Sequence, residues 1–82
     1  MQLEILTPSE TVFSGEVTLI KVPGSSGSFE ILKNHAPIIS ALNEGEIRIE
    51  TVASETVKYR ISGGLIEVNK NHIVALAESI ID

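Results

Sequence analysis

Two histidines and a loop rich in glycine and serine are the parts of this sequence whose residue types could support chemistry. His35 and His72 lie far apart, and neither has a second histidine or a carboxylate at the spacing typical of a zinc site. The chain has no cysteine, so it offers neither a thiolate ligand nor a disulfide. We therefore predict no metal site. We expect the ring of His35 to hydrogen-bond its own loop backbone, with contact to a partner protein as the alternative.

The loop over residues 24–28 is a candidate phosphate cradle, because backbone amides of glycine-rich loops can bind phosphate. Phosphate loops of the mononucleotide type end in Gly-Lys-Ser or Gly-Lys-Thr and open a helix. This loop has no lysine and leads into the segment 29–31, which predicts a strand, and Glu30 disfavours an anion there. We interpret the loop as a flexible turn. No Gly-x-Ser-x-Gly elbow is present either, so we predict no catalytic residue and no cofactor.

Composition indicates one globular domain covering residues 1–82, because a chain of this length folds around a single core. A hydrophobic content of 43% argues against disorder. The net charge of −5, without a basic cluster, argues against binding to nucleic acid. No segment approaches the roughly 20 apolar residues that span a bilayer, so we expect no direct membrane insertion.

The clearest structural signal is a hairpin. Residues 46–50 and 57–61 alternate polar and apolar side chains, as a strand with one wet face does, and a short polar turn lies between them. We expect the isoleucines of the first strand to be buried. Arg48, Lys58 and Arg60 are then expected to face water beside Glu46 and Glu50 as a ladder of opposite charges.

The remaining chain also predicts strands. Residues 3–6 and 11–13 form an opening pair, the run 29–42 holds two short strands around an exposed loop, and 73–77 is the last strand. Residues 16–22 carry apolar side chains on both faces, which indicates a strand covered on both sides or crossing between sheets. We expect a bulge at Gly15, and a bulge or close backbone approach at Gly63 and Gly64. The predicted fold is all-β, a flattened two-sheet β-sandwich of about ten short strands without a substantial helix.

Several short motifs, in this order and spacing, resemble the amino-terminal β-sandwich domain of the epsilon subunit of F-type ATP synthase, and together they run through nearly the whole chain. They are Leu3-Glu4-Ile5-Leu6-Thr7-Pro8, Val12-Phe13-Ser14-Gly15, His35-Ala36-Pro37, Gly45-x-Ile47-Arg48, Ser62-Gly63-Gly64 and Ala75-Leu76-Ala77-Glu78.

The resemblance implies a non-catalytic rotor subunit of the central stalk, which binds the gamma subunit and the c-ring and couples proton-driven rotation to ATP synthesis. It further implies a peripheral location at the cytoplasmic face of the bacterial plasma membrane. Typical epsilon subunits continue into two helices, which in some bacteria bind ATP. This sequence stops at Asp82, so we expect no ATP binding.

The resemblance also implies two contact surfaces. The residues expected to face gamma are Thr7, Ser40, Leu42, Ser62 and Glu67; those expected to face the c-ring are Ser25, Ser26, Gly27, Ser28, Glu30 and His35. A carboxylate common in the family is absent at Ser28, and Glu30 is expected to replace it in pairing with a basic ring loop. We expect Leu42→Asp to weaken the gamma complex without disturbing the fold.

The alternative interpretation comes from a different class of protein. It is a small ligand-binding or structural β-sandwich module of another assembly. In its ligand-binding form, His35 and Glu30 would form a site.

Overall fold

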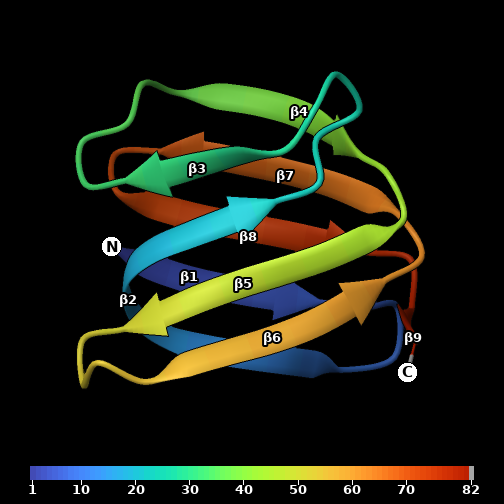
Figure 1. Ribbon diagram of the computed structural model, residues 1–82, viewed down its shortest axis with the longest axis horizontal. Helices are drawn as coiled ribbons and strands as arrows, with labels where there is room; N and C mark the ends of the chain where they lie inside the picture. Colours follow the sequence, from blue (N-terminus) through green and yellow to red (C-terminus); the bar gives the residue numbers. More distant parts are fainter. Residues whose placement is uncertain (82) are drawn as a thin grey trace.

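The computed structural model describes residues 1–81, and the regular structure within them consists of strands alone (Figure 1). The strands are β1 (Gln2–Leu6), β2 (Thr11–Val22), β3 (Phe29–Leu32), β4 (Ile38–Leu42), β5 (Gly45–Thr51), β6 (Thr56–Ile61), β7 (Gly64–Asn69), β8 (His72–Ala77) and β9 (Ile80–Ile81). The all-β prediction is confirmed, with nine strands in place of about ten. Within the described residues there is no helix able to cross a membrane.

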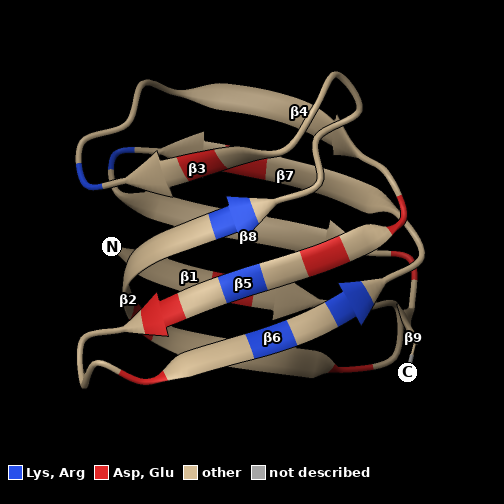
Figure 2. Cartoon of the chain, viewed as in Figure 1, with Lys and Arg blue, Asp and Glu red and all other residues tan. Residues whose placement is uncertain are grey.

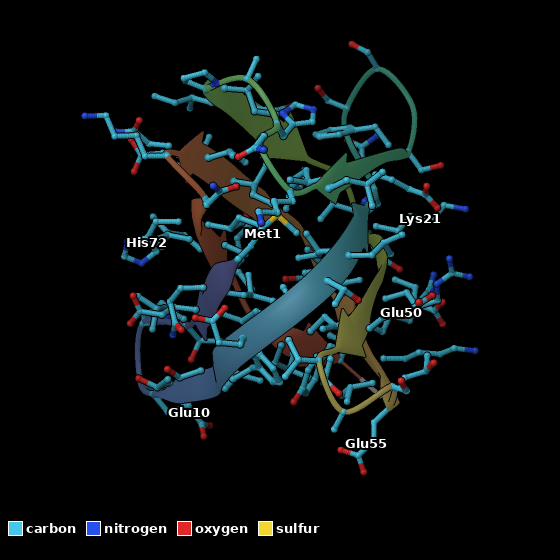
Figure 3. All side chains as sticks on the ribbon, turned by 90° about the vertical axis from the view of Figure 1, so that its left-hand side faces the viewer. Met1, Glu10, Lys21, Glu50, Glu55 and His72 are labelled. Atoms are coloured by element: carbon cyan, nitrogen blue, oxygen red, sulfur yellow. The ribbon has the colours of Figure 1, made fainter. Side chains whose placement is uncertain are left out.

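The strands form two packed layers that share β2. The order in the first layer, sheet A, is β4-β7-β8-β1-β2, and the order in the second, sheet B, is β3-β2-β5-β6-β9. Neighbouring strands are antiparallel except β1 and β8, which are parallel. Figure 3 shows the layers edge-on, with β2 running diagonally from one to the other. The predicted two-sheet sandwich is confirmed.

The change of sheet within β2 takes place at a β-bulge. Residues up to Glu16 pair with β1, and pairing with β5 begins at Val17 and shifts register before Leu19. The extra residue, Thr18, reverses which alternate positions face inward, so Val17 and Ile20 are both buried although three positions separate them. The predicted crossing between sheets is confirmed. The predicted bulge at Gly15 is wrong, because Gly15 lies opposite Leu3 in regular register.

The core between the sheets is aliphatic. No polar or charged residue of the described range is fully buried. Branched side chains dominate the core, and they suit strands because their restricted rotamers pack well on a pleated surface. The buried residues are Leu3, Ile5, Val17, Ile20, Val22, Ile31, Leu42, Ile47, Ile49, Ile61, Ile66, Val68, Ile73, Ala75 and Ala77.

The β5–β6 hairpin is confirmed, and Glu46 stands opposite Arg60 as the predicted ladder requires, but the ion pairs of its arginines are made with other carboxylates. Arg48 stands directly opposite Lys58, and its carboxylate partner is Glu30 on β3, at 3.6 Å. Arg60 lies 3.8 Å from Glu44, before the start of β5. Figure 2 shows charges of both signs interspersed over the outer face of sheet B. Such a face is well solvated and costly to dehydrate.

Gly64 allows two backbones to approach closely, as the sequence predicted. A Cβ at this position would lie 2.1 Å from the carbonyl oxygen of Leu76 on β8, which is far inside van der Waals contact. Gly15 differs, because a Cβ there would meet only the ring of Phe13, at 3.5 Å. The register between β7 and β8 therefore depends on the missing side chain of Gly64.

We predict that Gly64→Ala lowers the free energy of unfolding by about 2–3 kcal/mol, because the strand must shift to relieve the overlap. Urea denaturation measures the change. Gly15→Ala is the matched control and should change stability by no more than about 0.5 kcal/mol. Equal stabilities of the two variants would show that β7 and β8 are not held this closely.

Candidate protein-binding surfaces

The two ends of the sandwich present different loops. We call one end, formed by residues 7–10, 23–28, 42–44, 62–63 and 78–79, the glycine-loop end; it lies at the right in Figure 1. The opposite end, formed by residues 33–37, 52–55 and 69–71, is the histidine-loop end. The predicted ring-contact residues are divided between them, because β3 separates Ser25–Ser28 from His35. The structure does not bring these two segments together.

The loop from Gly24 to Ser28 is anchored at its base beside β4. The amide of Ser25 donates to the carbonyl of Ala41 at 3.0 Å, and the amide of Gly27 donates to the carbonyl of Gly24 at 3.0 Å. The amide of Gly24 donates to Val22 at 3.1 Å. These amides are therefore not available to cradle a phosphate, which agrees with the interpretation of the loop as a turn. The side chains of residues 25–28 are exposed.

The histidine loop is held by its own backbone and by one side-chain pair. Nδ1 of His35 lies 2.8 Å from the carbonyl oxygen of Ala36, so Nδ1 carries the proton in this bond and the predicted loop contact is confirmed. Asn34 and Asn71 both have positive φ, and they join their turns through two bonds. The amide of Asn34 donates to Oδ1 of Asn71 at 2.7 Å, and Nδ2 of Asn71 donates to Oδ1 of Asn34 at 3.0 Å.

Glu30 lies on the outer face of sheet B, outside the loop that it was expected to complete. Its carboxylate is paired with Arg48, and no bond within residues 1–81 joins it to His35. The ligand site of the alternative interpretation is therefore not assembled. Sequence reasoning instead missed Glu10, Glu44 and Glu78, which the turns place at the glycine-loop end. Each of these glutamates is next to the first or last residue of a strand, and the sequence could have shown this. Only the topology shows that all three lie at the same end of the sandwich.

The predicted gamma-contact residues also fall into groups. Thr7 and Ser62 share the glycine-loop end: Thr7 lines a cavity of about 340 Å³ together with Ser79, whose hydroxyl lies 2.8 Å from that of Ser62. Glu67 is exposed on β7, on the outer face of sheet A. Ser40 is half-buried and alternates with the exposed positions of β4.

Leu42 is a correction to the prediction. It is only 5% exposed and belongs to the core, because its position in β4 points between the sheets. Its side chain cannot serve as an adhesive surface without first leaving the core. The expectation that Leu42→Asp preserves the fold is therefore wrong.

Sequence reasoning missed a row of apolar side chains on the outer face of sheet A. Leu6, Leu76, Leu65 and Ala41 stand in register across β1, β8, β7 and β4. We call these four residues the apolar row. Leu76 is 47% exposed and Leu65 39%. Two residues before Ala41 on β4, Ile39 is 68% exposed, so the apolar surface extends along the edge strand of sheet A.

A polar border adjoins this row. Glu67 stands in register between Ile39 and Val74, and Nε2 of His72 lies 3.2 Å from a carboxylate oxygen of Glu4 on the same face. The signal for this surface was present in the continuous apolar run of residues 73–77. A strand with only one buried face does not need apolar residues at every position.

Over residues 1–82 the sequence matches the family model described as ATP synthase, Delta/Epsilon chain, beta-sandwich domain. The chain belongs to this family. Membership confirms the predicted fold and the predicted non-catalytic role in the ATP synthase stalk, so the partners of the chain are other parts of that enzyme.

Two curated relatives illustrate the range of lengths. The ATP synthase epsilon chain of Chlorobium limicola is 39% identical over 79 residues, which cover 96% of this chain and 90% of the relative. The ATP synthase epsilon chain of Pelotomaculum thermopropionicum is 41% identical over 78 residues, and this chain covers 58% of it. The matched domain is thus most of one relative and little more than half of the other.

A solved structure shares the fold. In the mitochondrial ATP synthase of Euglena gracilis (OSCP, F1 and c-ring), one chain superimposes with a TM-score of 0.89 over 96% of this chain and 51% of its own length. The sequence identity is 22%, so this likeness shows the fold alone.

We predict that aspartate destabilises the domain to very different extents at two adjacent positions of β4. Leu42→Asp should lower the free energy of unfolding by more than about 3 kcal/mol, because it buries a carboxylate and removes a core side chain. Ala41→Asp, on the exposed face, should cost less than about 1 kcal/mol. Urea denaturation of both variants is the measurement. Comparable losses would contradict the placement of Leu42 and Ala41 on opposite faces of β4.

Proposed function

We propose that this domain joins the gamma subunit to the c-ring in the rotor of a bacterial ATP synthase, at the cytoplasmic face of the plasma membrane. The observation that carries the gamma contact is the apolar row, with Ile39 beside it. We assign gamma to this outer face of sheet A and the c-ring to the glycine-loop end. The family membership of the chain supports the assembly.

The energetic argument for the gamma surface is the difference between the two outer faces. Burying a leucine side chain fully contributes about 1.5–3 kcal/mol, and Leu76 and Leu65 retain 47% and 39% of their exposure for a partner to remove. A partner on sheet B would have to dehydrate Lys21, Arg48 and Lys58 instead, which costs free energy unless each is matched. Apolar contact therefore favours sheet A, with Glu67 and Glu4 as a polar rim.

The argument for the ring surface is charge and position. The exposed residues 25–28 lie at the same end as Glu10, Glu44 and Glu78, so that end complements a basic ring loop even though Ser28 is not acidic. The strand ends and the sheet face are different sides of one body. The two partners therefore bind without competing, and a torque applied at one contact is passed to the other through the packed core.

We predict that Leu76→Glu weakens the complex with gamma by about thirtyfold, because it places a carboxylate in the middle of the apolar row. Titration calorimetry of the purified subunits measures the affinity. Val52→Glu is the matched control, since Val52 is 65% exposed but lies in the β5–β6 turn. If Val52→Glu lost binding while Leu76→Glu bound fully, the gamma contact would lie near the β5–β6 turn and not on the outer face of sheet A.

We also predict that a cysteine at Ser26 cross-links to a cysteine in the polar loop of the c-ring. The chain has no native cysteine, so each single variant reports one position. Ala53→Cys, in the exposed turn at the histidine-loop end, should remain uncross-linked in the same assembled enzyme. A cross-link through Ala53→Cys alone would reverse the orientation of the domain.

A further inference from the structure

The edge of sheet A at β4 has unpaired backbone groups. In β4, the carbonyl of Ala41 accepts from Ser25, on the side away from β7. Because backbone groups alternate along a strand, the N–H and C=O of Ile39 point the same way, as do the C=O of Pro37 and the N–H of Ala41. Within residues 1–81, none of these four groups has a backbone hydrogen-bond partner on the side away from β7.

This edge carries no charged side chain that would oppose strand pairing. β4 contains no charged residue, whereas β3, the edge of sheet B, carries Glu30, and β9 at the other edge is only two residues long. Ile39, at the middle of the free stretch, is the most exposed large apolar residue of the described chain. A shallow, open surface pocket of about 420 Å³ lies beside it, lined by Pro37, Ile38, Ile39, Glu67, Val68 and Asn69.

The chain itself shows how a strand can add at this edge. Gly24 stands antiparallel to Leu42 in an isolated bridge, closed by the bonds from Ser25 to Ala41 and from Asn43 to Pro23, at 3.0 and 2.8 Å. This segment covers only the last residues of β4. The rest of the edge, from Pro37 to the N–H of Ala41, has no such segment beside it.

We propose that an extended, apolar segment of the gamma subunit adds to sheet A as a further strand along β4, centred on Ile39. This proposal rests on the proposed function, and its support is that Ala41 belongs both to the apolar row and to the free edge. A partner that covers the apolar row on the outer face of sheet A therefore also contacts the free edge of β4. The new backbone bonds would fix the register of gamma, while the apolar row supplies the contact area.

A second copy of this chain is a poor occupant. Only the stretch from Pro37 to Ala41 is free, so pairing of two β4 edges joins a few residues from each copy. A stable interface buries about 1,200–2,000 Å², which so short a pairing does not approach. The edge therefore fits a partner that also covers the face of the sheet.

The test is hydrogen exchange of the full chain, free and bound to gamma. The amides of Ile39 and Ala41 should be protected at least tenfold by gamma, whereas the Ser40 amide, directed at β7, should be slow in both states. A complex in which Ile39 and Ala41 exchange as in the free chain overturns the added strand but leaves the proposed function standing. Failure to form any complex overturns both. A dimer of the isolated chain with a protected Ile39 amide assigns the edge to a second copy and overturns the proposal.

A pair of variants tests the backbone bond separately. Ile39→Ala and Ile39→Pro both remove the isoleucine side chain, but only Ile39→Pro removes the N–H. We expect Ile39→Pro to bind gamma about tenfold more weakly than Ile39→Ala. Equal affinities of two folded variants would contradict the bond. If the proline variant does not fold, hydrogen exchange of the unaltered chain decides alone.

Discussion

The bulge at Thr18 is the constraint on which the rest of the fold depends. Because it reverses the inward side of β2, the strand presents Phe13 to the core where it pairs with β1, and Ile20 to the core where it pairs with β5. The hydroxyl of Thr18 donates to the carbonyl of Glu50 at 3.2 Å and fixes the site of the bend. The two layers are therefore joined covalently through one strand as well as by packing, which opposes their sliding.

The difference between the outer faces follows from the same arrangement. β5 and β6 alternate strictly, so sheet B buries one side and exposes charge on the other. β7 and β8 carry apolar residues on both sides, such as Leu65 beside Ile66, yet only one side meets the core. The excess apolar surface costs solvation free energy in the isolated domain, and a partner that covered it would recover that free energy. Leu32 is also exposed on sheet B, at 52%, but on its own strand it follows the exposed Glu30, whereas the apolar row of sheet A is continuous over four strands.

The sequence predicted the parts of the fold that depend on neighbours in the chain. The β5–β6 hairpin needs only alternation and a short turn, and the close approach at Gly64 needs only a glycine in a strand. Which side chains of β4 point into the core was not predictable. Every position except Ser40 is apolar, so the sequence does not show whether Leu42 faces the core or the solvent. Which loops share an end was also inaccessible, since that depends on the direction of each strand in the finished sheets.

The small size of the domain connects its stability to its partners. A chain of this length buries only about 60% of its unfolded surface, so its folding free energy is modest. Any partner that binds only the folded sandwich adds its binding free energy to that margin. A contact spread over β1, β8, β7 and β4 crosses most of sheet A, so local opening of these strands would have to break the partner contact as well. A partner bound across these strands would therefore also stiffen the sheet.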